Sequence, residues 1–157
     1  MIIRDFKKED QSIVLALIKS INEKSFDKAK RLRPFRYEDL EDIYMSYCQG
    51  RDTFAVIEDH DELEIFGTIA LKEDFGDVAL VRRCFVSKNY QKRGYGMRLM
   101  SHILGVARKK GFKSIELRCT DDMLAMVSLA LKVGFSEKKS FEIAVNRSVL
   151  ILQKKLA

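Results

Sequence analysis

The hexapeptide Gln91-Lys92-Arg93-Gly94-Tyr95-Gly96 links an apolar run that ends at Val86 to an amphipathic stretch that continues to Lys110. Its two glycines allow the backbone to approach a bulky anion closely. A helix that begins at these glycines turns its unpaired N–H groups and the positive end of its dipole toward the same point. Lys92 and Arg93 add full positive charge. A strand, a basic glycine loop and a helix, in that order, predict a cradle for phosphate.

The whole chain has the size and composition of one folded domain covering residues 1–157. Hydrophobic residues make up 46% of it, and it has one proline, no internal repeat and no Gly/Ser-rich linker. Charges at residues 4–9 interrupt the apolar run that a signal peptide needs, and no segment has the roughly 18 apolar residues of a spanning helix. We therefore expect a cytoplasmic protein, monomeric or homodimeric, without a membrane partner.

The net charge of +6 suits an acidic ligand. Basic residues are densest between positions 24 and 36, but few aromatic residues alternate with them as a base-stacking surface requires, so nucleic acid is not the expected partner. Cys48, Cys84 and Cys119 are too widely spaced for a disulfide framework or a zinc site, and His60 lies in a polar turn. We expect reduced thiols in the core and no metal.

Hydropathy periods and turn residues predict the order strand, two helices, three strands, helix, strand, helix and two strands. The predicted strands cover residues 2–4, 53–57, 63–71, 78–86, 112–119, 135–143 and 148–154. The predicted helices follow Asp10 to Ile21, cover residues 37–48, run from the glycine loop to Lys110 and cover residues 123–133. The last helix is apolar nearly all round, which predicts that it is well buried. This order is typical of an α/β protein with a mixed sheet and helices on both faces.

Two common nucleotide loops fit the hexapeptide poorly. A Walker loop needs Gly-Lys followed by Ser or Thr, whereas Gly96 precedes Met97 and Arg98. A Rossmann loop needs a third small residue where Leu99 stands, and its first glycine follows the strand almost directly. Seven residues, 87–93, intervene here.

A third interpretation fits better, because the chain resembles the GCN5-related N-acetyltransferase (GNAT) family over nearly its whole length. The family pattern Gln/Arg-x-x-Gly-x-Gly/Ala matches Gln91, Gly94 and Gly96, and the strand ending at Val86 looks like the family's fourth strand. Gly134-Phe135 is similar to the pair that ends the family's fourth helix, and residues 149–156 resemble its last strand. The resemblance implies a GNAT-like acyl-CoA N-acyltransferase fold, with about seven strands in a mixed, mostly antiparallel sheet.

The resemblance also implies acetyl-coenzyme A as cosubstrate. The family holds the pyrophosphate on N–H groups at the helix start and lays the pantetheine arm along the fourth strand. Carried onto this chain, the cofactor-binding residues are Cys84, Phe85, Val86, Gln91, Lys92, Arg93, Gly94, Tyr95, Gly96 and Met97. A backbone N–H near Phe85 or Val86 would serve the oxyanion.

Three positions depart from the family pattern. The frequent general-acid tyrosine is Ala130, the frequent cofactor-contacting asparagine is Met123, and the frequent glutamate base is Leu80. The catalytic residues therefore stay unknown. Side chains that could help move protons are Glu73, Asp74, Asp77, Glu116, Glu142, Cys84 and Ser128.

Two functions remain open. One is acetyl transfer from acetyl-coenzyme A to a primary amine of a small molecule or a protein, by direct attack in a ternary complex. The other is a non-catalytic acyl-coenzyme A binder or sensor. The resemblance implies that the acceptor site is shaped by residues 24–47 and 141–147.

Overall fold

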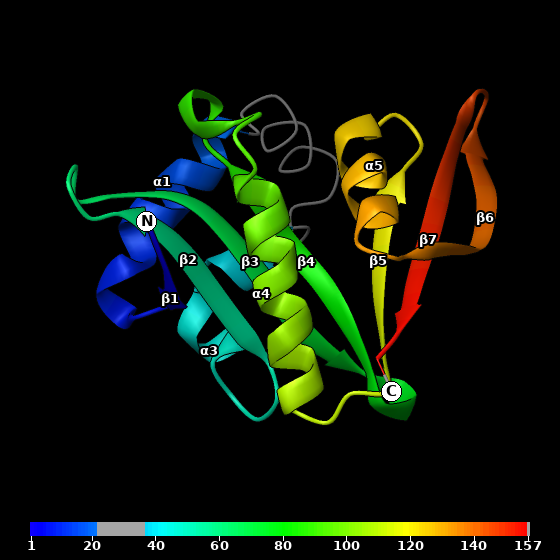
Figure 1. The fold of residues 1–157 in the computed structure, drawn as a ribbon, viewed down its shortest axis with the longest axis horizontal. Coiled ribbons are helices and arrows are strands. Elements are labelled where there is room, and N and C mark those ends of the chain that lie inside the picture. Colours follow the sequence, from blue (N-terminus) through cyan, green and yellow to red (C-terminus); the bar gives the residue numbers. More distant parts are fainter. Residues whose placement is uncertain (22–36, 157) are drawn as a thin grey trace.

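The computed structural model describes residues 1–21 and 37–156, in which a seven-stranded mixed sheet has the order β1-β2-β3-β4-β5-β7-β6 (Figure 1). The strands are β1 Ile2–Asp5, β2 Thr53–Asp59, β3 Glu64–Asp74, β4 Val78–Val86, β5 Ser114–Thr120, β6 Ser136–Ala144 and β7 Arg147–Lys155. Only β4 and β5 pair in parallel, and the other neighbours are antiparallel. The predicted fold class is confirmed.

Helices cover both faces of the sheet. The α-helices are α1 Gln11–Ile21, α3 Ile43–Tyr47, α4 Tyr95–Lys109 and α5 Leu124–Lys132, and short 3₁₀ turns are η1 Lys8–Asp10, η2 Glu38–Leu40, η3 Phe75–Asp77 and η4 Lys88–Tyr90. Side chains of α4 and α5 join one hydrophobic cluster with the sheet, and those of α1 and α3 join another. The sheet therefore separates two layers of helix.

The N-terminal helices differ in detail from their predictions. The predicted helix over residues 37–48 is wrong as a single element, because η2 and α3 divide it. The Asp42 carboxylate accepts the Met45 N–H at 3.1 Å and so caps a new helix. Asp10 does not cap α1 but ends η1, where its carboxylate accepts the Lys7 N–H and pairs with Arg4. Residues 22–36, expected to form a loop or irregular helix, lie outside the described residues.

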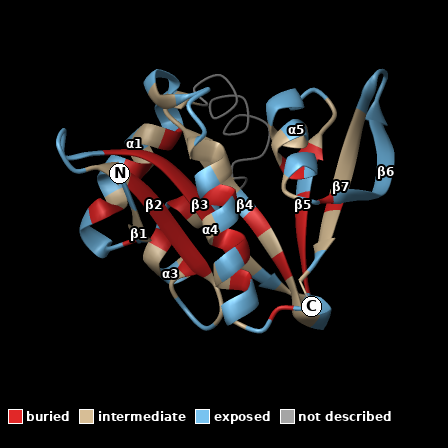
Figure 2. Ribbon diagram, viewed as in Figure 1, coloured by how far each residue is buried: buried red, intermediate tan, exposed pale blue. Residues whose placement is uncertain are grey.

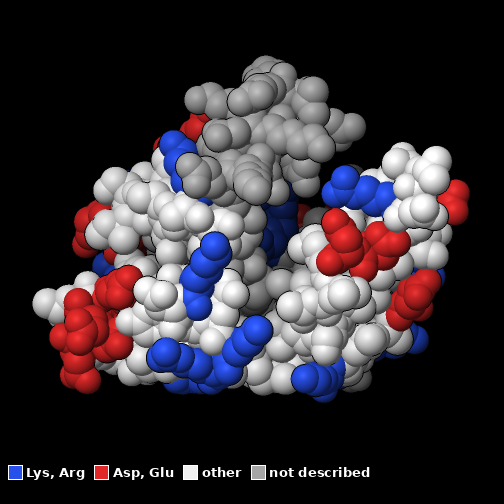
Figure 3. All heavy atoms as spheres, turned by 90° about the horizontal axis from the view of Figure 1, so that it is seen from above, with Lys and Arg blue, Asp and Glu red and all other residues white. Residues whose placement is uncertain are grey.

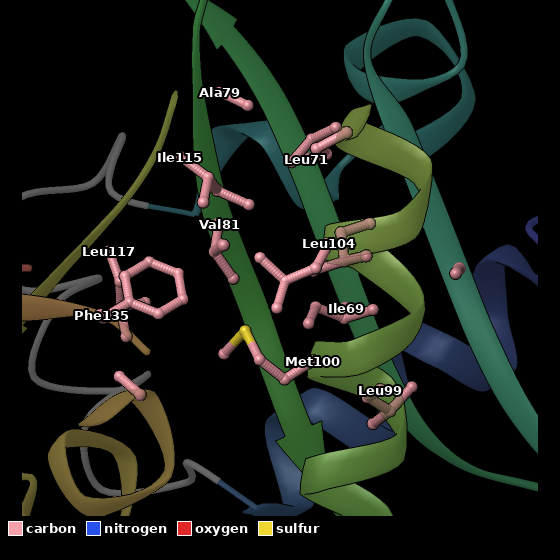
Figure 4. Close-up of a cluster of buried hydrophobic side chains, with 14 of the residues drawn as sticks. Ile69, Leu71, Ala79, Val81, Leu99, Met100, Leu104, Ile115, Leu117 and Phe135 are labelled. Atoms are coloured by element: carbon pink, nitrogen blue, oxygen red, sulfur yellow. The ribbon is translucent and has the colours of Figure 1, made fainter. Parts of the chain in front are cut away.

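The main core lies between α4 and the sheet. The buried residues of α4 are Leu99, Met100, Ile103, Leu104 and Ala107, which recur at the helical spacing. Met100 and Leu104 point toward Val81 on β4, while Ile115, Leu117 and Phe135 approach from the β5 side (Figure 4). This packing ties the helix after the glycine loop to the two parallel strands.

A β-bulge interrupts β4 at Arg83, whose φ of 53° is left-handed. Thr68 on β3 pairs with Phe85, and Ala70 pairs with Arg82, so Arg83 and Cys84 together stand opposite one residue of β3. The extra residue changes which side chains face α4. Cys84 and Val86 pack against the α4 cluster, as Ala79 and Val81 do before the bulge, and Phe85 packs on the opposite face.

The parallel strands β4 and β5 pair only at one end. Their register runs from Val78 beside Ser114 to Val81 beside Leu117. Beyond that point the two strands diverge, and the sheet opens like a V whose arms carry α4 and α5 (Figure 1). The second half of β4 is therefore not paired with β5.

The prediction that the last helix is well buried is wrong. Ala130 is the buried residue of α5, while Leu124 and Leu131 are 74% and 53% exposed. Much of α5 and all of β6 are exposed in Figure 2. This helix packs on only one arm of the V. The sheet surface there is too small to bury all of its apolar side chains. Within residues 1–21 and 37–156, no helix has the length and hydropathy needed to cross a bilayer.

Candidate functional site

Beyond Val81, the edge of β4 on the β5 side has no strand partner among residues 1–21 and 37–156. Cys84, Phe85 and Val86 form the last three residues of this strand, beyond its final pair with β5. Backbone N–H and C=O groups on an unpaired edge can bind an extended ligand as if it were a further strand. The structure brings these three predicted residues to the same opening as the glycine loop.

The helix α4 begins at the end of this opening with free N–H groups. Its first intrahelical bond is donated by the Arg98 N–H to the Gly94 carbonyl, at 3.1 Å. No acceptor in the described part of the chain bonds the N–H groups of Tyr95, Gly96 or Met97, and no side chain caps the helix. These donors and the helix dipole favour an anion at this point.

The two glycines of the loop are needed for different reasons. Gly94 has a φ of 86°, and a Cβ there would meet no atom within 4 Å, so the left-handed turn is what requires glycine. Gly96 lies inside α4, where a Cβ would stand 3.3 Å from Leu129 Cδ2 on α5. Gly96 thus permits the close approach of two helices. The expected clearance for a pyrophosphate stays a prediction.

An aromatic cluster of Phe66, Tyr90 and Tyr95 holds the loop against the sheet. The Phe66 and Tyr90 rings stack with centroids 4.0 Å apart, and the Tyr95 ring meets Phe66 edge-on at 4.9 Å. The Gln91 Nε2 donates to the Val86 carbonyl at 2.8 Å, which joins the loop to the end of β4. Gln91 therefore helps to hold the glycine loop in place beside β4.

Cationic side chains surround the start of α4. Lys92 and Arg93 are exposed. The Arg93 guanidinium lies 5.8 Å from the Tyr90 ring centroid, and that of Arg98 lies 5.9 Å from the Tyr95 ring. Seen from above, Lys and Arg atoms lie beside and within the hollow between the two halves of the molecule (Figure 3). The site has the charge that a polyanion needs.

None of the three cysteine thiols is activated as a nucleophile. Burial raises the pKa of Cys84 to about 12, and burial also raises the pKa of Cys48 and Cys119. Thiols in this state stay protonated near neutral pH and are poor nucleophiles. The prediction that Cys84 and Cys119 are core thiols is confirmed, because both pack in the α4 cluster.

Three predicted carboxylates lie at the closed end of the V. The Arg51 guanidinium holds Glu73 at 2.6 Å and Asp77 at 2.8 Å, and its hydrogen bond lowers the pKa of Asp77. Asp74 lies 3.6 Å from the Arg118 guanidinium. Asp77 precedes Cys84 by about 20 Å of extended strand, so these groups could act on the acceptor only through water, and that role stays a prediction.

Glu116 is the predicted carboxylate that lies where the V opens. It stands beside Leu80 in the register of β4 and β5, on the face opposite α4. Its side chain is 6% exposed, and the Lys138 Nζ donates to its Oε1 at 2.7 Å. Glu142, by contrast, is exposed on the edge strand β6.

The α5 positions also have clear places. Met123 precedes α5 and is 45% exposed, whereas Ala130 is fully buried in the α4 cluster. Ser128 is exposed. Met123 and Ala130 supply neither the cofactor amide nor the general acid that the family often has at these positions, and a role of Ser128 in protonating the thiolate stays a prediction.

The polar network behind the bulge was not apparent from the sequence. The Arg83 Nε and Nη2 donate to the Asp39 carboxylate at 2.9 and 2.6 Å, and the Tyr47 hydroxyl donates to the same group at 2.5 Å. Two arginines within an apolar strand were the one available signal for a bulge there. Nothing in the sequence paired them with Asp39, forty-four residues earlier. Among residues 1–21 and 37–156, no group of His, Cys, Asp and Glu could hold a metal ion.

Comparison with known proteins places this geometry in a family. The sequence model of the Acetyltransferase (GNAT) family matches residues 16–135. A Xenopus tropicalis protein named "Probable N-acetyltransferase 14" is 32% identical over 108 residues, which cover 67% of this chain and 51% of that protein. The chain spans about half the length of the curated relatives it matches.

Solved structures share the fold at low sequence identity. A GNAT-family acetyltransferase from Staphylococcus aureus Mu50 superposes with a TM-score of 0.82, 20% identity and 99% coverage of both chains. A Bacillus anthracis protein solved in complex with acetyl coenzyme A gives a TM-score of 0.65 and 19% identity, over 73% of this chain and 68% of that one.

Proposed function

Because the chain belongs to the GNAT acetyltransferase family, we propose that it transfers the acetyl group of acetyl-coenzyme A to a primary amine of a small molecule or a protein. The end of β4, which has no strand partner on its β5 side among the described residues, is followed along the chain by the uncapped start of α4. The strand edge can bind an extended pantetheine arm, and the helix start can bind a pyrophosphate. This site and the family membership are what support the proposed acceptor amine and the proposed acetyl transfer.

The residues at the opening fit acetyl-coenzyme A. The N–H groups from Arg93 to Met97 would hold the pyrophosphate, and Lys92 and Arg93 would add charge. The edge from Cys84 to Val86 would hold the pantetheine amides, and space is open beside Gly94. The bound cosubstrate would supply an acetyl thioester, an acyl group already activated for attack by an amine.

The chain's own groups favour direct attack by the acceptor. Burial raises the pKa of all three cysteines, so no described thiol is poised to take the acetyl group first. A backbone N–H near Phe85 or Val86 would stabilise negative charge on the carbonyl oxygen. The bulge at Arg83, fixed by a hydrogen bond of 2.7 Å from Thr68 Oγ1 to the Arg83 carbonyl, orients this segment.

A non-catalytic acyl-coenzyme A binder is the second candidate. It is favoured by the apolar positions Leu80, Met123 and Ala130, since the buried Ala130 cannot donate a proton to a departing thiolate. A thiolate is a fair leaving group, so the absence of this donor slows transfer without preventing it.

Two measurements test the proposed function. Calorimetric titration with acetyl-coenzyme A measures binding, and thiol release over a panel of primary amines and lysine peptides measures transfer. We expect Arg93→Ala to weaken acetyl-coenzyme A binding several-fold, because one cation at the start of α4 is lost. Arg108→Ala, at the exposed far end of α4, is the matched control and should bind as the wild type does. Binding without amine-dependent thiol release would favour the sensor.

A further inference from the structure

The carboxylate of Glu116 has a position that the proposed transfer can use. We propose that Glu116 receives the ammonium group of the acceptor and removes the proton that must leave before the amine attacks. This inference rests on the proposed function and names a residue for its proton transfer.

The register of the sheet places Glu116 at the mouth of the gap. Leu80 on β4 is its neighbour on the adjacent strand, about 4.8 Å away, and one further pair closes the parallel ladder. Ile115 and Leu117 point into the α4 cluster, so alternation turns Glu116 to the opposite face. Because α4 and α5 cover the other face, an acceptor that binds Glu116 would approach it from this one.

Leu80 occupies the strand position at which the family often carries a glutamate. The structure shows that a carboxylate is nevertheless present one strand away, at the same level and on the same face. From Leu80 to Cys84 the strand advances about 12 Å, a span that one or two waters and an amine can bridge.

Lys138 shows that this carboxylate binds a primary ammonium group. Its Nζ lies 2.7 Å from Glu116 Oε1, although Glu116 is 6% exposed and Lys138 is 51% exposed. A solvated lysine on the edge strand β6 can leave without breaking the core. An incoming ammonium group therefore meets a carboxylate that is already shaped for it, in exchange for Lys138.

The other described charged groups near Glu116 contact it less closely than Lys138 does. The Arg118 guanidinium lies 3.8 Å from Glu116 Oε2 and also 3.6 Å from the Asp74 carboxylate. Arg82, two residues beyond Leu80 on β4, is exposed, and Gln153 on β7 is the neutral register partner. Among residues 1–21 and 37–156, the Oε2 contact is long and Oε1 accepts the one short hydrogen bond.

The proposed step moves protons from the acceptor nitrogen to Glu116, to the thiolate and to solvent. The acceptor ammonium gives one proton to the Glu116 carboxylate, directly or through water, and becomes a neutral amine. The amine nitrogen forms a bond to the acetyl carbon as the carbon–sulfur bond breaks. The second proton leaves the nitrogen as the amide forms, the thiolate takes up a proton, and Glu116 returns its proton to solvent.

Opposite substitutions of the ion pair separate this role from a structural one. Glu116→Gln and Lys138→Gln both remove the contact between these two side chains. A structural role predicts that both variants lose activity in the same way. The proposed role predicts that Glu116→Gln lowers kcat/KM about 100-fold, whereas Lys138→Gln lowers KM for the amine because it removes a competing ammonium group.

The assay uses the full chain and the best acceptor among tyramine, spermidine and a lysine peptide. The kcat/KM of Glu116→Gln should approach the wild-type value as the pH nears the pKa of the acceptor amine, because free amine needs no base, and Glu116→Asp should restore part of the rate at lower pH. Glu137→Gln, a matched change on the exposed strand β6, should behave as the wild type does. Calorimetry should give an unchanged acetyl-coenzyme A affinity for every variant, a readout independent of turnover.

The outcomes distinguish this inference from the proposed function. Wild-type turnover with an unaltered pH profile in Glu116→Gln overturns the role of Glu116 alone. Equal losses in Glu116→Gln and Lys138→Gln also overturn it, because they indicate a structural ion pair. Wild-type protein that transfers no acetyl group to any amine removes the proposed function, and the role of Glu116 with it.

Discussion

The guanidinium of Arg83 forms a two-pronged ion pair with the carboxylate of Asp39, with donor–acceptor distances of 2.9 and 2.6 Å. Arg83 lies in the bulge of β4, and Asp39 lies in η2, which precedes α3. The side chains are 12% and 16% exposed. This contact anchors the bulge, and therefore the edge of β4 beside the gap, to the helical layer of α1 and α3.

Asp39→Asn should destabilise the protein by about 2 kcal/mol, since it leaves a mostly buried arginine with a neutral partner. Denaturant unfolding measures the loss, and Asp61→Asn in the exposed turn between β2 and β3 is the control. A loss no larger than that of the control would show that the ion pair does not stabilise the bulge.

The same carboxylate should make stability depend on pH. Burial raises the pKa of Asp39, but hydrogen bonds from Arg83 and Tyr47 outweigh burial and leave it below its ordinary value of 3.8. The stabilisation is therefore present above pH 3.8 and is lost as the pH falls through the lower folded pKa. Unfolding curves between pH 2 and pH 6 should converge for wild type and Asp39→Asn at the acidic end. A difference that stays constant over this range contradicts the assignment.

Tyr90→Ala should loosen the glycine loop while the core remains folded. The stacked contact with Phe66 is worth about 1 kcal/mol beyond burial, so we expect acetyl-coenzyme A affinity to fall roughly tenfold by calorimetry. Tyr90→Phe keeps the ring and removes only the hydroxyl contact with Glu64 at 3.2 Å. It should bind nearly as the wild type does. Equal losses in both variants would point to the hydroxyl rather than the ring.

The thiols should resist alkylation in the native protein. Because burial raises the pKa of Cys84 to about 12, little thiolate is present at pH 8. Iodoacetamide labelling followed by peptide mass spectrometry should modify Cys84 slowly in the folded protein and rapidly in denaturant. Rapid labelling of Cys84 in the native protein, at the same rate with and without acetyl-coenzyme A, would contradict the buried environment of this thiol.

Local patterns were sufficient to predict much of the fold. The spacing of apolar residues from Leu99 to Ala107 identified the buried face of α4, and the apolar runs identified the strands. Glycine conformation at Gly94 and the helix start were also predictable, because turn chemistry is local. The candidate acyl-coenzyme A site follows from these local features together with the family pattern.

The rest depended on contacts between distant residues. Whether Glu116 faces the gap follows from its register with Leu80, and that register is set by tertiary packing. The division of residues 37–48 arises from Asp42, whose capping competes with helix continuation. Gly96 could be recognised as a candidate phosphate glycine, but its packing against Leu129 belongs to the contact between α4 and α5.

The most direct measurement of acetyl transfer follows thiol release and acetylated amine together in one reaction with acetyl-coenzyme A. Mass spectrometry identifies the product, and a colorimetric assay counts the thiol. We predict that both rise in equal amounts, only when a primary amine and the protein are present. Tight binding of acetyl-coenzyme A without any acetylated amine, across the whole panel of small amines and lysine peptides, would contradict transfer and leave a binding protein.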